Sequence, residues 1–193
     1  MEPPSPTEPS WEALYEVAAT QEGHFTARQA ASAGYSPPLL AHHQNAGRIV
    51  RVRRGIYRLT HYPPGDHEEL VTAWLWSESL GVISHQTALS LQGLSDVMPP
   101  QIHLTLPLPW QRRRLRVPKG LVLHFADVPP EERSWINAVP MTSTSRTLND
   151  CADANMAPDL LRGAAKQALA RGLTKPAELR AVEKALAPFG GIK

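Results

Sequence analysis

The sequence predicts an α/β or α+β fold in two parts, because two different patterns follow one another along its 193 residues. Residues 10–59 contain three short helical segments and then a basic hairpin, whereas residues 66–193 alternate strand-like with helix-like segments. A hydrophobic content of 42% suffices for a packed core in each part. We therefore expect a leader over 1–9, a first domain over 10–62 and a second domain over 66–193.

The composition excludes several classes of protein. Cys151 is the only cysteine, which rules out a disulfide framework and a cysteine-rich zinc site and fits a reducing cytoplasm. No apolar run reaches the length of a membrane helix, and the N-terminus lacks a signal pattern. The opening MEPPSPTEPS is proline-rich and polar, so we expect a disordered leader there.

The first two helices are short and bounded by residues with clear local roles. Apolar residues recur at helical spacing from Trp11, which places the start of the first helix at Ser10 or Trp11 and its end by Gly23. Thr26 is expected to cap a second helix over 27–33.

The third helix has clear signals at both of its ends. Ser36 is expected to cap it, Pro37 suits its first position, and Gly47 marks its stop. A helical wheel gives an inner face of Leu39, Leu40, His43 and Ala46. The same wheel gives an outer face of Pro38, Ala41, His42, Gln44 and Asn45. Asn and Gln can pair with adenine edges, although the alternative of a solvated polar helix stays open.

The hairpin after this helix is predicted from strand alternation. Residues 49–53 alternate, Arg54-Gly55 forms a turn, and residues 56–59 return. We expect Val50 and Val52 to face inward and Arg51 and Arg53 to face outward. Three helices followed by a two-stranded hairpin predict a winged helix-turn-helix.

The charge of this segment indicates a polyanionic partner. Residues 24–65 contain six arginines and no Asp or Glu, so they carry +6, and the remaining residues carry −4 because the whole chain has a net charge of +2. A charge run is often only a solvated face, but solvated faces usually mix both signs. Arginines on the wing are suited to phosphates or to the minor groove.

The second part predicts a C-terminal small mixed sheet with flanking helices. Asp66 is expected to cap its first helix and Ser84 a second one. The expected strands cover 82–84, 102–107, 121–127 and 136–142. The expected helices cover 67–79, 85–94, 143–154, 158–171 and 176–187.

The sequence contains no recognisable catalytic or metal motif. None of its eight histidines has metal-ligand spacing, and we expect His85 and His103 to satisfy hydrogen bonds in the core. Glu183 and Lys184, which could belong to a nuclease motif, fall on a predicted helix with no strand before it. We therefore expect no enzyme, no cofactor and no bound metal.

A second basic cluster lies between two predicted strands. It consists of Arg112, Arg113, Arg114 and Arg116, followed by Lys119. Three interpretations stay open: a solvated hairpin loop, a further phosphate contact, or a docking site for an acidic protein surface.

The segment GHFTARQAASAGYSPPLLAHHQNAGRIVRVRRGIYRL resembles the N-terminal domain of AbiEi-family antitoxins from type IV toxin–antitoxin systems. It matches that family's F-T-x-x-Q-A-x-x-x-G-Y-S and G-R-x-x-R-V-x-R-G-x-Y-R-L patterns. The later stretches SHQTALSLQGLSDVMPPQIHLTLP and VPMTSTSRTLND are similar to its C-terminal portion, with Gln92 where histidine is commoner.

The resemblance implies a cytoplasmic, autoregulating transcriptional repressor that takes part in phage defence. It implies double-stranded DNA of the protein's own promoter as one partner, read as repeated half-sites, and a nucleotidyltransferase-like toxin as the other. Repression would belong to the N-terminal domain, and neutralisation would need the C-terminal part. The residues expected to contact DNA are Thr26, Arg28, Gln29, Ser36, Pro38, Ala41, His42, Gln44, Asn45, Arg48, Arg51, Arg53, Arg54 and Arg58.

Two other functions are compatible with the same residues. The basic domain could bind the toxin or another protein directly, or the protein could be a winged-helix regulator unrelated to any toxin. A nucleotidyltransferase-like reading frame beside the gene would favour the antitoxin.

Overall fold

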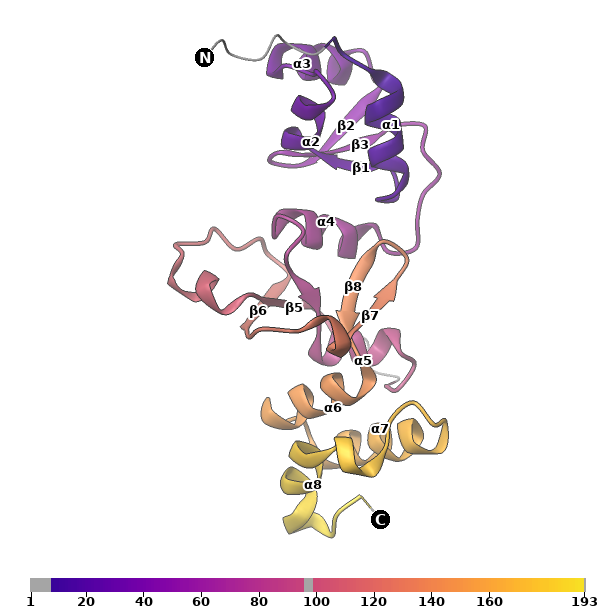
Figure 1. Ribbon diagram of the computed structural model, residues 1–193, viewed down its shortest axis with the longest axis vertical. Helices are drawn as coiled ribbons and strands as arrows, with labels where there is room; N and C mark the ends of the chain where they lie inside the picture. The colour runs from indigo at the N-terminus through magenta and orange to yellow at the C-terminus, as the bar shows by residue number, and fades with distance from the viewer. Residues whose placement is uncertain (1–7, 96–98, 193) are drawn as a thin grey trace. The chain divides into compact units, whose positions relative to one another are not determined.

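The computed structural model describes residues 8–95 and 99–192 and shows a mixed α/β chain (Figure 1). It divides into two compact units between Ser79 and Leu80, here called the N-terminal and C-terminal units. The expected leader over 1–9 falls mostly outside the described residues. The first helix begins at Trp11 with Ser10 as its cap, as the sequence predicts.

The N-terminal unit has the element order of a winged helix. Its elements are α1 (Trp11–Ala19), β1 (His24–Thr26), α2 (Ala27–Ser32), α3 (Pro37–Asn45), β2 (Ile49–Arg53), β3 (Ile56–Leu59) and α4 (Glu68–Trp76). The three strands form an antiparallel sheet in the order β1-β3-β2. The sequence did not predict β1, because three residues are too few to show strand alternation.

The core of the N-terminal unit joins α1, α2 and α3 to the sheet. Leu14 of α1, Phe25 of β1, Leu40 of α3 and Ile49 of β2 are buried within one cluster. Burial of this apolar surface supplies the main stabilisation of such a small unit.

Helix α4 is grouped with the N-terminal unit, where it lies against β1 and β3. The sequence had assigned these residues to the second domain, and the functional boundary at residues 62 and 66 stays a prediction. The expected cap by Asp66 is wrong, because His67 occupies the cap position without a side-chain hydrogen bond. Glu68 instead accepts a hydrogen bond from the backbone of Gly65 at 3.2 Å.

The C-terminal unit combines a mixed five-stranded sheet with helices. Its strands are β4 (Val82–Ile83), β5 (Ile102–Leu106), β6 (Leu121–Phe125), β7 (Arg133–Ile136) and β8 (Val139–Thr142), in the order β6-β5-β4-β8-β7. Its helices are α5 (His85–Leu91), α6 (Thr144–Asp153), α7 (Pro158–Ala170) and α8 (Arg180–Leu186). Short 3-10 turns cover Leu108–Arg112, Pro130–Glu132, Pro176–Glu178 and Ala187–Phe189.

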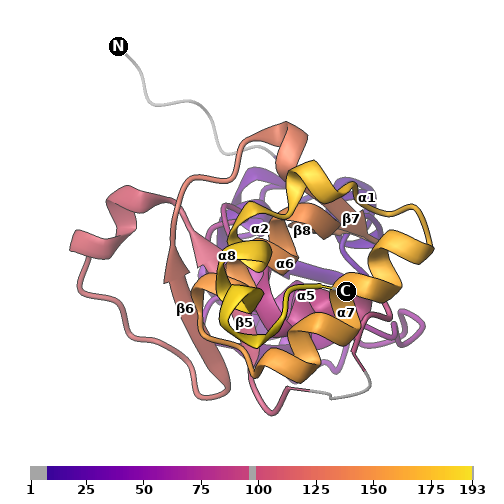
Figure 2. The ribbon, with the colours of Figure 1, turned by 90° about the horizontal axis from the view of Figure 1, so that it is seen from below.

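The core of the C-terminal unit is formed largely by its helices. Leu89 of α5, Leu148 of α6, Leu161 of α7 and Leu186 of α8 are fully buried in one cluster, and Figure 2 shows these helices gathered together. Helix α5 also contacts β5 and β8, so it links the helical cluster to the sheet.

Two sequence predictions for this unit require correction. Residues 136–142 were expected to form one strand, but the structure shows a β7–β8 hairpin whose turn includes Asn137 at φ 48°. Asn tolerates this left-handed conformation through its short polar side chain. Ser84 does precede α5, but its hydroxyl makes no capping hydrogen bond.

Candidate nucleic-acid interface

Helix α3 presents an exposed polar face, as its sequence predicts. Ser36 caps the helix by accepting a hydrogen bond from the backbone of Leu39 at 3.4 Å, and Pro37 occupies the first turn. The outer residues Ser36, Pro38, Ala41, His42, Gln44 and Asn45 are all exposed. This face therefore has no competing contact with the core and is free to enter a groove.

The opposite side of α3 is held in place by aromatic packing. Leu40 is buried, and the ring of His43 stacks on Trp11 at 5.6 Å and meets the edge of Tyr35 at 5.4 Å. Burial, Arg48 and His42 lower the pKa of His43, so its imidazole is neutral at pH 7. Ala46 was expected on this inner face, but it is exposed at the helix end.

The β2–β3 hairpin carries the exposed arginines of the wing. Arg51, Arg53 and Arg54 are exposed, and the pairing of β2 with β3 shifts register between Arg51 and Arg53. The turn is fixed to the start of α2, because Gly55 accepts a hydrogen bond from the backbone of Ala27 at 2.8 Å. The wing therefore offers three cations on an anchored backbone.

The expectation that Val50 and Val52 face the core is wrong. Their side chains are 51% and 41% exposed, and only Ile49 of β2 is buried. The strand extends beyond the small core after its first residue, so alternation no longer separates an inner face from an outer one.

Arg58 serves the fold of the N-terminal unit. Its guanidinium forms an ion pair with Glu68 at 2.8 Å and donates to the carbonyl of Tyr62 at 2.9 Å. The side chain is only 16% exposed. Arg58 joins β3 to the chain that leads into α4, and its expected contact with DNA stays a prediction.

The side chains of Thr26 and Gln29 also form hydrogen bonds within the N-terminal unit. They form a reciprocal capping box at the start of α2, in which Gln29 accepts from the backbone of Thr26 at 2.8 Å. The amide of Gln29 also donates to the side chain of Gln21 at 2.9 Å. Of the expected residues at this helix, Arg28 keeps an exposed side chain.

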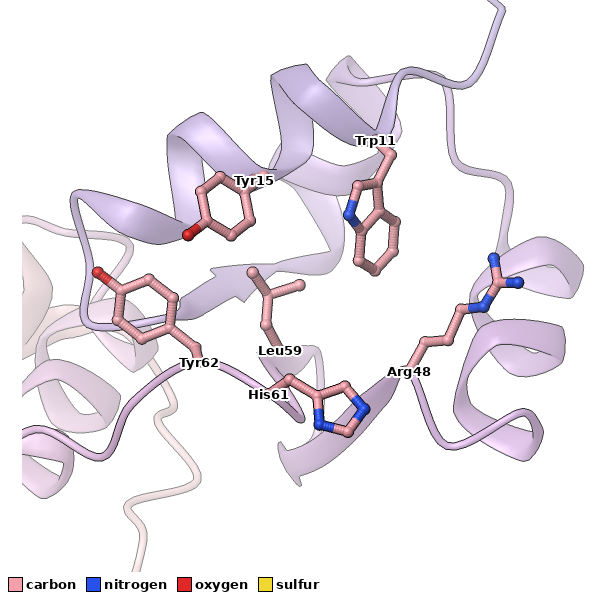
Figure 3. A pocket seen from close by; sticks show the side chains of 6 residues that line it. All are labelled: Trp11, Tyr15, Arg48, Leu59, His61 and Tyr62. Carbon is pink, nitrogen blue, oxygen red and sulfur yellow. The ribbon is translucent and has the colours of Figure 1, made fainter.

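A hollow beside α1, with a volume of about 480 Å³, was not predicted from the sequence (Figure 3). Trp11, Tyr15, Leu59, His61 and Tyr62 line it together with Arg48, which follows α3. Trp11 and Tyr15 have the helical spacing of core residues, so the sequence pattern gave no sign that their rings are 39% and 48% exposed.

The second basic cluster lies on the connection between β5 and β6. These strands are parallel, so the connection is a crossover, and the interpretation of this segment as a hairpin loop is wrong. Arg112, Arg114 and Arg116 are exposed, and the guanidinium of Arg113 lies 4.1 Å from the ring centre of Trp110. A DNA or protein contact by this cluster stays a prediction.

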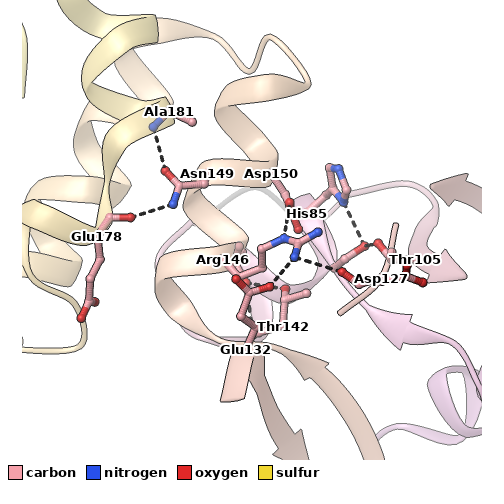
Figure 4. Close-up of polar contacts among 12 residues, drawn as sticks. His85, Thr105, Asp127, Glu132, Thr142, Arg146, Asn149, Asp150, Glu178 and Ala181 are labelled. Atoms are coloured by element: carbon pink, nitrogen blue, oxygen red, sulfur yellow. Dashed lines mark hydrogen bonds and ion pairs between the residues drawn. The ribbon is translucent and has the colours of Figure 1, made fainter. Parts of the chain in front are cut away.

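The motif residues of the C-terminal unit form a polar network that joins its elements (Figure 4). Arg146 of α6 pairs with Asp150 at 2.7 Å and also with Glu132. Asn149 of α6 accepts from the backbone of Ala181 at 3.1 Å and so holds the start of α8. These contacts give the R-T-L-x-D stretch a structural role.

Gln92 has a similar role at the end of α5. Its amide donates to the carbonyl of Thr142 at 2.8 Å and to the hydroxyl of Thr147 at 3.2 Å. The side chain thereby links α5 to β8 and α6.

The N-terminal unit is therefore a winged helix-turn-helix that carries an exposed basic surface. Residues 12–60 match the model of a family described as "Transcriptional regulator, AbiEi antitoxin". This confirms the resemblance seen in the N-terminal segment of the sequence, and it makes this segment similar to transcriptional regulators among the antitoxins.

Other comparisons add context. The crystal structure of the RV2827C protein from Mycobacterium tuberculosis is similar with a TM-score of 0.42 and 14% identity, over 98% of this chain and 81% of that one. No curated protein matches the chain. Within the described residues, no helix combines the length and apolar character needed to cross a membrane.

Proposed function

We propose that this protein is a cytoplasmic DNA-binding antitoxin that represses its own promoter and antagonises a nucleotidyltransferase-like toxin encoded beside it. The observation that carries the DNA-binding half is the combination of an exposed polar α3 face with an adjacent arginine wing in a segment without carboxylates. The match of residues 12–60 to antitoxin transcriptional regulators supports repression as the outcome of binding.

The proposed division of labour gives α3 the reading of bases and the wing the phosphates. The outer α3 residues Gln44 and Asn45 are amides suited to base edges, whereas Arg51, Arg53 and Arg54 are flexible cations suited to the backbone. Arg28 and Arg48 add positive charge at the edges of this surface. A single short helix reads few bases, so two protein molecules on repeated half-sites would supply specificity.

The C-terminal part, from about residue 66, is proposed to carry the antitoxin role through binding rather than catalysis. The resemblance of its SHQTAL and SRTLND stretches to AbiEi antitoxins supports this assignment. The exposed arginines of the β5–β6 connection are a candidate contact for the toxin or for flanking DNA.

A reporter assay tests both halves of the proposal. The promoter is fused to a reporter, and the protein is expressed with and without the neighbouring toxin gene. We expect the full chain to repress the promoter and to rescue cells from the toxin. The Arg53→Ala, Arg54→Ala variant should lose repression. Repression without any toxic neighbour would instead favour a winged-helix regulator unrelated to a toxin. Rescue without repression would favour a protein-binding module.

A further inference from the structure

Three histidines from three elements of the C-terminal unit meet on one face of the sheet. His85 is the first residue of α5, His103 lies on β5 and His124 lies on β6. Thr105 is paired with His124 in the parallel β5–β6 ladder, and side chains two apart on a strand share a face. His103 therefore points to the same side as His124, and α5 brings His85 to them.

Their nitrogen atoms are close to the spacing that a metal ion requires. One ligand nitrogen from each ring lies within 4.8 Å of the other two. His103 Nδ1 and His124 Nε2 are 3.0 Å apart. A tetrahedral zinc ion with Zn–N bonds of about 2.0–2.1 Å separates its ligand atoms by about 3.3 Å. Two of the three nitrogens thus already have almost the ligand spacing.

The ring of His85 lies directly against this pair. It stacks on the ring of His124, with 3.5 Å between ring centres and 14° between planes.

The Ser84 hydroxyl contacts one nitrogen of His85 and leaves the other open to a metal. Ser84 Oγ lies 2.9 Å from His85 Nδ1 and accepts a hydrogen bond from Thr105 Oγ1 at 2.7 Å. An Nδ1 proton donated to Ser84 leaves the lone pair on Nε2, and such outer hydrogen bonds orient the histidine ligands of metal sites. His85 also adopts φ 51°, a left-handed conformation that is uncommon outside glycine.

Burial keeps all three rings in the form that binds metal. It lowers the pKa of His85 to about 3 and that of His124 to about 4, and it also lowers the pKa of His103. Metal ions bind the neutral imidazole, so protons compete weakly at pH 7. Arg146 is the cation that acts on His85, and its charge is offset by Glu132 and Asp150.

We propose that the C-terminal unit binds one divalent transition-metal ion, with zinc as the best fit, through His85 Nε2 and one nitrogen each of His103 and His124. Three imidazoles suit Zn²⁺, Co²⁺ or Ni²⁺ and not Mg²⁺ or Ca²⁺, which prefer oxygen ligands. The bound ion ties α5 to β5 and β6. This inference goes beyond the proposed DNA binding and does not depend on it.

Isothermal titration of the chelator-treated full-length protein with Zn²⁺ tests the site. We expect one ion per chain for the wild type. Binding should weaken by at least about 100-fold in His103→Gln or His124→Gln, since each removes a ligand, and by about 10-fold in Ser84→Ala, which removes the group that orients His85. The matched controls His61→Gln and His42→Gln remove exposed histidines of the N-terminal unit and should bind as the wild type does.

Co²⁺ provides a readout that does not require a variant to fold. Intense visible absorption of the wild-type complex indicates the expected four-coordinate site. The proposal is overturned if the wild type binds no stoichiometric ion, which would make the cluster a set of hydrogen-bonded histidines only. It is equally overturned if folded His103→Gln and His124→Gln bind like the wild type, or if the controls lose the ion.

Discussion

The double substitution Arg53→Ala, Arg54→Ala removes two exposed cations from the wing without touching the buried core of the N-terminal unit. Each phosphate contact contributes about 0.9 to the slope of log K against log salt concentration. Loss of two contacts therefore lowers the slope by about 1.8, so the wild type's advantage in affinity shrinks about tenfold between 50 and 200 mM salt. The effect should be the same for promoter and unrelated DNA, because phosphates carry no sequence information.

Fluorescence anisotropy with labelled duplexes at several salt concentrations measures this slope. Lys166→Ala, Lys184→Ala is the matched control, since it removes the same charge from exposed positions on α7 and α8. We expect the control to keep the wild-type slope. A wing variant that also keeps it would refute the placement of these arginines on the DNA backbone.

Three further predictions follow from the same structure. Gln44→Ala should cost about 1–3 kcal/mol at particular base pairs and leave non-specific binding intact, which competition between operator variants measures; an equal loss on all sequences would contradict base reading. A fragment of residues 1–79 should bind the promoter without rescuing cells from the toxin. A shorter fragment of residues 1–62 should melt at a lower temperature than the 1–79 fragment, because it lacks α4 and the Glu68 partner of Arg58. Equal melting temperatures would disprove a stabilising role for α4. The pKa values of His85 and His124 are lowered in the folded state, so protons bind more tightly to the unfolded chain. The free energy of unfolding of the metal-free protein should therefore be full above pH 6.5 and fall as the pH drops toward about 4 and then about 3. The slope is at most about 1.4 kcal/mol per pH unit per histidine, and an unchanged slope of denaturant-derived stability in His124→Gln would contradict this.

Local signals in the sequence were sufficient to predict helix α3. Ser36 and Pro37 mark its start, and the mixture of apolar and polar residues separates Leu40 from the exposed Gln44. These signals depend on neighbours in the chain, so they persist in the folded unit. The same reasoning gave the helices and most strands of the C-terminal unit.

Features that depend on distant partners could not be predicted in this way. The exposed arginines and Arg58 look alike in the sequence, and only the approach of Glu68 gives Arg58 a structural role. Strand alternation gave Val50 an inner face, but it contains no information on where the core ends. The histidine cluster is assembled by the β5–β6 pairing and by α5, so no short motif announces it.

Footprinting of the purified protein on its own promoter tests the central proposal most directly. We predict protection of two half-sites separated by one helical turn or a multiple of it, each occupied by one molecule. Gln44→Ala should alter the preferred bases equally in both half-sites. Protection of a single unrepeated site would contradict a DNA-reading repressor. So would the absence of protection at protein concentrations that saturate DNA binding in the anisotropy assay.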